Sequence, residues 1–170
     1  MHQRTSTPLP TVPPTATPTP TPVPGPAKLI IIPKVNLYAP VVESALKDGA
    51  WEVPKFAAGH LQGTANPGQG SNVALSGHVE SISSGNVFAH LDQLRPGDRI
   101  YLRTDREEFL YVVTKTLVVR NTDLSIVQPT SQDQVTLITC TGNWLPTARD
   151  FDQRRVVLGV LQARAPLPRK

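Results

Sequence analysis

Hydrophobic residues recur in short runs from residue 28 onward, and Gly, Pro, Asn and Asp separate these runs. Runs of this length, bounded by turn-forming residues, are typical of β-strands. Residues 86–94 are predicted to form only one short helical turn. The predicted strands are 28–37, 39–44, 72–79, 98–104, 108–119, 135–140 and 154–163. Many short strands with little helix predict a mostly β fold, either a closed or nearly closed barrel or a sandwich.

Two of these strands show a clear alternation of apolar and polar positions. Successive side chains of a strand point to opposite faces of the sheet, so residues two apart share a face. In the 72–79 strand, Val73 and Leu75 form the apolar face and His78 lies on the other. In the 135–140 strand, the face of Leu137 is predicted to be core, and Cys140 projects from the opposite face.

The last predicted strand is apolar at most positions. Val156, Leu158 and Val160 form an unbroken apolar face, which we predict to be core. Arg155 then points away from the core, whereas Arg154 lies on the same face of the strand as Val156, Leu158 and Val160. His78, Cys140 and Arg155 are therefore all expected on the non-core side of the sheet, where one shared site is permitted.

The first 26 residues differ in composition from the rest of the chain. They contain nine Pro and seven Thr and almost no residue that could build a core. Repeated Thr-Pro holds the backbone near polyproline II, so 1–26 is predicted to be a semi-rigid extended linker, suited to a surface stalk. An SH3-type ligand is disfavoured because no basic residue flanks its PxxP frames. A stalk also suggests an N-terminal membrane anchor upstream; we expect a catalytic domain over 27–165 and a tail over 166–170.

Composition and charge exclude several function classes. The chain is 39% hydrophobic and 18% charged, with a net charge of +4 and basic residues that are scattered along the sequence. This pattern favours a solvated basic surface over nucleic-acid binding. A single cysteine excludes an internal disulfide, and without a CxxC pair we expect neither a zinc site nor another metal or cofactor. No apolar run is long enough to span a membrane, so the segment itself is expected to be soluble.

Cys140 has two interpretations. A lone cysteine is more often a buried structural residue than a nucleophile. A thiolate beside an imidazolium and a guanidinium, however, is suited to acyl transfer through a thioester, because the guanidinium can stabilise an oxyanion.

Four stretches of the chain and one arginine resemble the sortases. They are TLITC at 136–140, Arg155 fifteen residues after the cysteine, LSGHV at 75–79, IIIPKVNLYAPVVE at 30–43 and NVFAHLDQLRPGDRIYLRT at 86–104. The resemblance covers essentially Lys28 to Gln162. It implies an eight-stranded sortase-type β-barrel with short helices, and a surface cysteine transpeptidase at the extracellular face of the cell membrane.

The resemblance also implies substrates and roles. Such enzymes cleave an LPxTG-like sorting signal between Thr and Gly and pass the acyl group to an amine of a cell-wall precursor or a pilin. Cys140 would be the nucleophile, His78 the general acid and base, and Arg155 the residue that stabilises the oxyanion, with Arg154 as the alternative. Thr139 and Trp144 are expected to contact the substrate.

Departures from the family pattern limit these expectations. The 141–153 segment, expected as a loop, differs from the housekeeping versions, and the linker suits class D, E or F sortases. His60 is expected in a loop and His90 in packing or on a helix surface. Two alternatives compete: L,D-transpeptidases, whose SxGCR motif is absent around Cys140, and a non-enzymatic wall-exposed β-domain on a stalk, which predicts an unreactive thiol.

Overall fold

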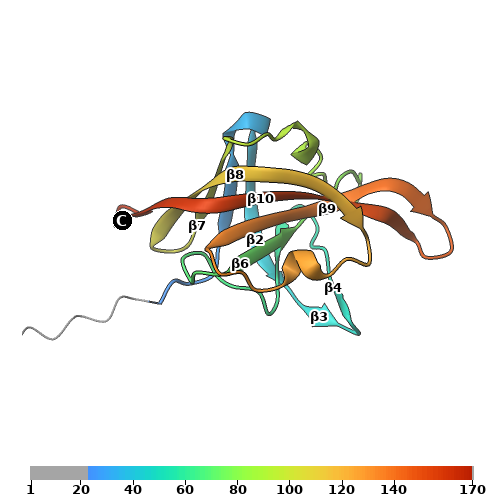
Figure 1. Cartoon of the computed structure of the whole chain (residues 1–170), viewed down its shortest axis with the longest axis horizontal. Helices are drawn as coiled ribbons and strands as arrows, with labels where there is room; N and C mark the ends of the chain where they lie inside the picture. Colours follow the sequence, from blue (N-terminus) through green and yellow to red (C-terminus); the bar gives the residue numbers. More distant parts are fainter. Residues whose placement is uncertain (1–22, 170) are drawn as a thin grey trace, which may run out of the picture.

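The computed structural model describes residues 23–169, so most of the expected 1–26 linker lies outside the described residues. Within this range, eight strands close into a barrel in the order β1-β2-β5-β6-β9-β10-β8-β7 (Figure 1). β1 pairs with both β2 and β7, which closes the sheet. The predicted mostly β, eight-stranded barrel is confirmed.

The elements have the following bounds. The barrel strands are β1 Leu29–Ile32, β2 Leu37–Ser44, β5 Ala58–Leu61, β6 Asn72–Ser76, β7 Arg99–Arg103, β8 Glu107–Arg120, β9 Gln134–Leu145 and β10 Asp150–Pro166. A small separate hairpin consists of β3 Leu46–Lys47 and β4 Ala50–Trp51. Three short 3₁₀ helices are η1 Pro33–Val35, η2 Leu91–Gln93 and η3 Ser125–Val127.

Two strand pairs in the barrel are parallel, β2 with β5 and β6 with β9. Parallel strands place their carboxyl ends at the same edge of the sheet. Ser76 at the end of β6 lies beside Ile138 of β9. The loop that follows β6 and the segment that follows Ile138 therefore start next to each other, and these two segments carry His78 and Cys140.

The barrel interior confirms the predicted faces of β6 and β9. Val73 and Leu75 are fully buried in the main core, together with Leu137. Ala74 and Ile138 belong instead to a second apolar cluster, against which Trp51, Ile126 and Val127 pack. The barrel thus carries an apolar patch on its outer surface as well as a core.

The predicted faces of β10 were wrong. Val157, on the same face as Arg155, belongs to the main core, whereas Val156, Leu158 and Val160 point the other way. Val156 is also fully buried, and it pairs with Ile138 on the outer face of β9. When a strand has apolar residues on both faces, their alternation does not indicate which face is the core. In β10 the face that packs against the outer apolar patch was taken for the core face.

Some predicted boundaries were also wrong. β6 ends at Ser76, so His78 lies in the following loop, and the 86–94 helical turn is reduced to η2. The expected 141–153 loop is instead a continuation of β9 and β10, which form a hairpin arm that extends beyond the barrel (Figure 1). The arm adopts strand conformation because its backbone groups pair across the hairpin, which the mixed composition of 141–153 does not reveal.

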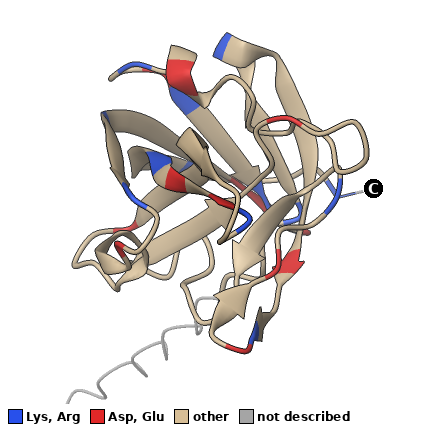
Figure 2. Cartoon of the chain, turned by 90° about the vertical axis from the view of Figure 1, so that its right-hand side faces the viewer, with Lys and Arg blue, Asp and Glu red and all other residues tan. Residues whose placement is uncertain are grey.

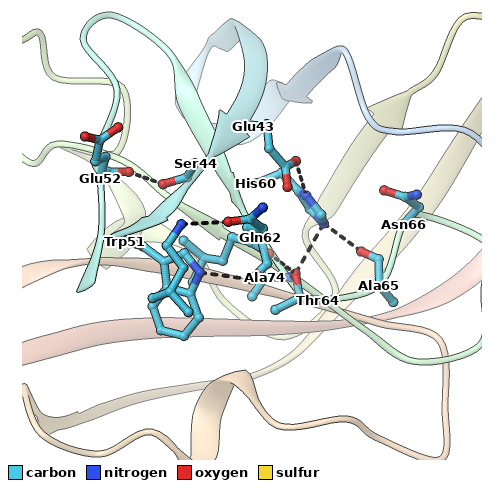
Figure 3. A network of polar contacts seen from close by, with 12 residues as sticks. Glu43, Ser44, Trp51, Glu52, His60, Gln62, Thr64, Ala65, Asn66 and Ala74 are labelled. Atoms are coloured by element: carbon cyan, nitrogen blue, oxygen red, sulfur yellow. Dashed lines mark hydrogen bonds and ion pairs between the residues drawn. The ribbon is translucent and has the colours of Figure 1, made fainter. Parts of the chain in front are cut away.

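His60 lies on β5 and is 5% exposed, so the expectation of an ordinary loop residue was wrong. Its Nδ1 lies 2.7 Å from Oε2 of Glu43, and its Nε2 lies 2.8 Å from the carbonyl oxygen of Ala65 (Figure 3). These contacts connect β2, β5 and the loop that precedes β6. Nearby, Trp51 Nε1 donates to the carbonyl of Gln62 at 3.0 Å, which fixes the β3–β4 hairpin against the same loop.

Charged residues of both signs are interspersed over the elements in Figure 2, as the scattered basic residues predicted. In residues 23–169, no helix has the length and apolarity needed to cross a membrane. The same residues contain no cluster of three or more His, Cys, Asp or Glu suited to a metal ion.

Candidate active site

Cys140 lies near the point where β9 leaves the barrel and enters the hairpin arm. It follows Ile138 on the outer face of the strand and is half-buried. Burial raises the pKa of its thiol above the ordinary value, the positive charge of Arg154 lowers it, and the Asp150 carboxylate raises it. Burial dominates, so the thiol favours its neutral form more than a free cysteine does.

Arg154, and not Arg155, lies directly opposite Cys140 in the antiparallel pairing of β9 and β10. Arg155 lies opposite Thr139. Directly opposite residues of an antiparallel pair place their side chains on the same face. The register therefore puts Arg154 on the outer face with Cys140 and Arg155 on the face that continues into the core.

The Arg154 guanidinium is held by several acceptors. Its Nη2 donates to Oδ2 of Asp150 at 2.6 Å, and its Nη1 donates to the carbonyls of Phe151 and Gln153 at 3.0 Å each. Asn121 Nδ2 also donates to Oδ2 of Asp150, at 3.5 Å. A guanidinium fixed by three acceptors loses little conformational freedom when it binds a further group. Sequence reasoning missed Asp150 and Asn121, because their role depends on the hairpin arm.

The loop that carries His78 is attached to β9 through Gly77. The Gly77 amide donates to the carbonyl of Ile138 at 3.2 Å, and the Thr139 hydroxyl donates to the carbonyl of Gly77 at 2.8 Å. Gly77, the residue before His78, is thus hydrogen-bonded to both residues that precede Cys140. The His78 carbonyl in turn accepts a hydrogen bond from the amide of Phe88 at 2.9 Å, which closes the loop.

Gly77 has a close neighbour that explains the residue type. A Cβ at this position would lie 2.8 Å from a ring atom of Phe88, and Phe88 is itself 1% exposed in the core. Such a contact is shorter than carbon atoms tolerate, so the loop before His78 can adopt this path only with glycine.

A groove lies over the outer apolar patch, and Arg154 forms part of its wall. Its volume is about 300 Å³. Trp51, Leu61, Ile126, Val127 and Ile138 supply its apolar lining, and Asn121, Asp123, Asp150 and Arg154 its polar lining. The groove therefore combines an apolar wall with a few charged residues, which is suited to an extended peptide with apolar side chains.

A second cavity of about 150 Å³ lies beside Cys140. Cys140, Thr139 and Arg155 line it, together with Asp92 of η2. Cys140 thus lines this cavity with Arg155, whereas its cross-strand neighbour Arg154 lines the groove.

The two residues expected to contact a substrate have different surroundings. Thr139 is 4% exposed and bonds to Gly77, so it connects β9 to the His78 loop. Trp144 lies on the hairpin arm, is 53% exposed and packs edge-on against Phe151 with ring centroids 5.3 Å apart. Trp144 lines neither the groove nor the second cavity. A substrate contact by Trp144 stays a prediction.

Comparison with known proteins identifies relatives of this chain. Residues 30–162 match the family model of the sortase domain. The chain is 33% identical to sortase A of Bacillus anthracis over 132 residues, which are 78% of this chain and 58% of that protein. It is 31% identical to sortase D of Bacillus subtilis over 66% of this chain and 52% of that protein. The chain thus spans between half and three fifths of the length of these two relatives.

Solved structures agree with the sequence matches. Listeria monocytogenes sortase A superposes with a TM-score of 0.69 at 25% identity, over 85% of this chain and 93% of that one. Sortase E1 of Streptomyces coelicolor, solved with a tripeptide in the active site, superposes with a TM-score of 0.67 at 25% identity, over 86% and 94%. The segment that matches the family model contains nearly all of the barrel, together with Cys140 and the loop of His78. This chain belongs to the sortase family.

Proposed function

We propose that the chain is a cysteine transpeptidase that cleaves an LPxTG-like sorting signal and transfers its acyl part to an amine. The observation that carries the proposal is the position of Cys140. It lies opposite a fixed guanidinium that lines an apolar groove, and beside the His78 loop.

The Cys140 sulfur, as thiolate, attacks the carbonyl carbon of the signal's Thr. The carbonyl oxygen becomes an oxyanion, and the Arg154 guanidinium supplies hydrogen bonds and charge to it. The C–N bond to Gly then breaks, and the imidazolium of His78 protonates the departing amine. A thioester on Cys140 remains. An incoming amine forms a new C–N bond, the C–S bond breaks, and neutral His78 takes up the proton that the amine loses.

The assignment of the oxyanion role to Arg154 replaces the expectation for Arg155. The reason for Arg155 was its predicted position on the non-core face, and the register of β9 and β10 reverses that face. Arg154 also contributes directly to the electrostatics of the thiol, because its charge lowers the pKa of Cys140.

The groove provides the donor subsite in this proposal. Ile126, Val127 and Ile138 would contact apolar side chains of the signal, and Arg154 in the groove wall would contact the scissile carbonyl. The tripeptide in sortase E1 of Streptomyces coelicolor supports a peptide as the occupant of a sortase active site.

The partners and the location complete the proposal. The donor would be a sorting signal of a surface protein, and the acceptor an amine of a cell-wall precursor or a pilin. The enzyme would act at the outer face of the cell membrane, with residues 1–26 as a stalk between the membrane and the barrel.

Intact-mass measurement tests the proposal directly. The protein is incubated with a panel of LPxTG-type peptides, first alone and then with an amine. We expect an acyl adduct on Cys140 and then a new amide product, and Cys140→Ala should give neither. His78→Ala and Arg154→Gln should each slow adduct formation. A complete lack of adduct and cleavage across the panel would support the non-enzymatic β-domain instead.

A further inference from the structure

The hydroxyl of Ser76 is the one buried side-chain polar atom in residues 23–169 that has no hydrogen-bond partner. Ser76 ends β6 and lines the apolar groove together with Trp51 and Ile138. The Nε1 donor of Trp51 is not free for it, because it already donates to the carbonyl of Gln62. A buried hydroxyl without a partner costs free energy, so the fold alone gives no reason for a serine at this position.

The register of the barrel places Ser76 close to the nucleophile. Ser76 pairs with Ile138 in the parallel ladder of β6 and β9, and Cys140 follows Ile138 on the outer face of β9. Neighbouring strands lie about 4.8 Å apart, and two residues along a strand span about 7 Å. The backbones of Ser76 and Cys140 are therefore separated by roughly 8 Å. A peptide residue that is bonded through its carbonyl carbon to the Cys140 sulfur can reach Ser76 with its own side chain.

We propose that Ser76 recognises the side-chain hydroxyl of the signal's Thr, and so selects the residue that forms the thioester. The inference rests on the proposed transpeptidase function and names a residue that determines its specificity. Leu and Pro of an LPxTG-like signal carry apolar side chains, and the x position varies. Thr thus supplies the only constant polar side chain on the acyl side of the scissile bond. A hydroxyl both donates and accepts, so the two hydroxyls can pair in either direction.

Recognition requires only a rotation of the Ser76 side chain. Its hydroxyl has no hydrogen bond to lose within residues 23–169, and a serine side chain has three staggered positions about its Cα–Cβ bond. Turning the oxygen toward the bound Thr replaces an unpaired buried group by a paired one. A signal with Val in place of Thr has nearly the same shape but leaves the Ser76 hydroxyl unpaired. A site that hydrogen-bonds a substrate hydroxyl rejects such an analogue more strongly than an apolar pocket does.

Peptide cleavage tests the proposal with a series that differs only at the Thr position. The peptides contain LPATG, LPASG, LPAVG or LPAAG, and kcat/KM is measured for each. Ser76→Ala should lower kcat/KM about tenfold for the Thr and Ser peptides, as expected for one lost hydrogen bond in a desolvated site. It should change kcat/KM less than about twofold for the Val and Ala peptides. Equal losses for all four peptides would overturn the proposal.

Ser131→Ala is the matched control, because Ser131 is exposed before β9 and lines neither the groove nor the second cavity. It should leave the preference for Thr over Val unchanged. Denaturant unfolding of Ser76→Ala distinguishes a structural role. We expect the midpoint to stay the same or to rise, because the variant removes an unpaired hydroxyl and no internal hydrogen bond. A lower midpoint together with equal losses for the four peptides would assign Ser76 to the fold and not to the substrate.

A binding measurement separates this inference from the proposed function. Cys140→Ala cannot form a thioester, so isothermal titration calorimetry gives its affinity for the LPATG and LPAVG peptides directly. Adding Ser76→Ala to this variant should lower the ratio of the two affinities about tenfold. An unchanged ratio would overturn the role of Ser76 even if the wild-type protein cleaves peptides. A ratio that depends on Ser76, without any cleavage by the wild-type protein, would support the role of Ser76 and contradict the transpeptidase.

Discussion

Arg154 donates from Nη2 to Oδ2 of Asp150 at 2.6 Å, so an acidic side chain fixes the guanidinium that lies opposite Cys140. Burial raises the pKa of Asp150, but hydrogen bonds from the Arg154 side chain and the Phe151 amide outweigh burial and hold this pKa below its ordinary value. Asp150 therefore stays ionised down to more acidic pH than a free aspartate. The pair places two opposite charges close to the Cys140 thiol, and each charge should shift the pKa of that thiol.

Replacing the two charged residues should move the thiol pKa in opposite directions. The Arg154 charge lowers the pKa of Cys140 and the Asp150 charge raises it. Arg154→Gln should therefore raise the pKa, and Asp150→Asn should lower it. The pH dependence of the rate of alkylation by iodoacetamide measures this pKa in each variant. Arg120→Gln serves as the control, and identical midpoints in all four proteins would contradict the electrostatic role of the pair.

The choice between Arg154 and Arg155 as the oxyanion residue is tested by peptide cleavage. Arg154→Gln should lower kcat/KM for a cleaved sorting-signal peptide by about 10²- to 10³-fold, the usual effect of removing an oxyanion donor. Arg154→Lys should recover only part of the activity, because an ammonium lacks the planar fork of donors. A larger loss in Arg155→Gln, measured without an acceptor amine, would favour the expectation drawn from the sequence.

Gly77→Ala should impair catalysis by displacing the His78 loop. The added Cβ would lie 2.8 Å from the ring of Phe88, which is buried in the core and has little room to move. We expect kcat for peptide cleavage to fall, because the loop must shift away from β9. The double variant Gly77→Ala with Phe88→Leu removes the ring and should recover part of kcat. Unchanged kcat in Gly77→Ala would show that the position of His78 does not depend on this contact.

The sequence predicted much of the fold, whereas the catalytic roles of Cys140 and His78 stay predictions. The alternation in β6 and β9 was informative because each strand has a clear core face, with Val73 and Leu137 in the main core. It failed in β10, where Val156 and Val157 are both fully buried. The alternation of side chains along a strand cannot distinguish a core face from a face that lines an apolar groove on the outer surface, since both require hydrophobic residues.

Other features depend on contacts between distant segments. The hairpin arm places Asp150 beside Arg154, and the second cavity combines Asp92 of η2 with Arg155 of β10. His60 looked like a loop residue because its partner Glu43 lies on a strand seventeen positions earlier. No pattern of neighbouring residues in the sequence indicates such pairings, because they form only when the barrel closes.

The groove wall depends on one buried amide, Asn72, and its replacement gives a last prediction. Asn72 is 2% exposed, and its Nδ2 donates to the carbonyls of Ile126 and Gln128 at 2.9 and 3.0 Å. Its Oδ1 accepts a hydrogen bond from the Thr136 hydroxyl at 2.6 Å. One side chain thus fixes η3, and with it the apolar wall of the groove, to β6 and β9.

Asn72→Ala should lower the free energy of unfolding by about 3 kcal/mol, because it leaves buried polar groups without partners. Thr136→Val removes only one of these bonds and should cost about 1 kcal/mol. Denaturant unfolding measures both values. Asn72→Ala should also raise KM for the peptide, since the wall with Ile126 and Val127 loosens, whereas Thr136→Val should leave KM unchanged. An equal KM in the two variants would mean that η3 keeps its place without the Asn72 amide, and that the groove wall is held by apolar packing alone.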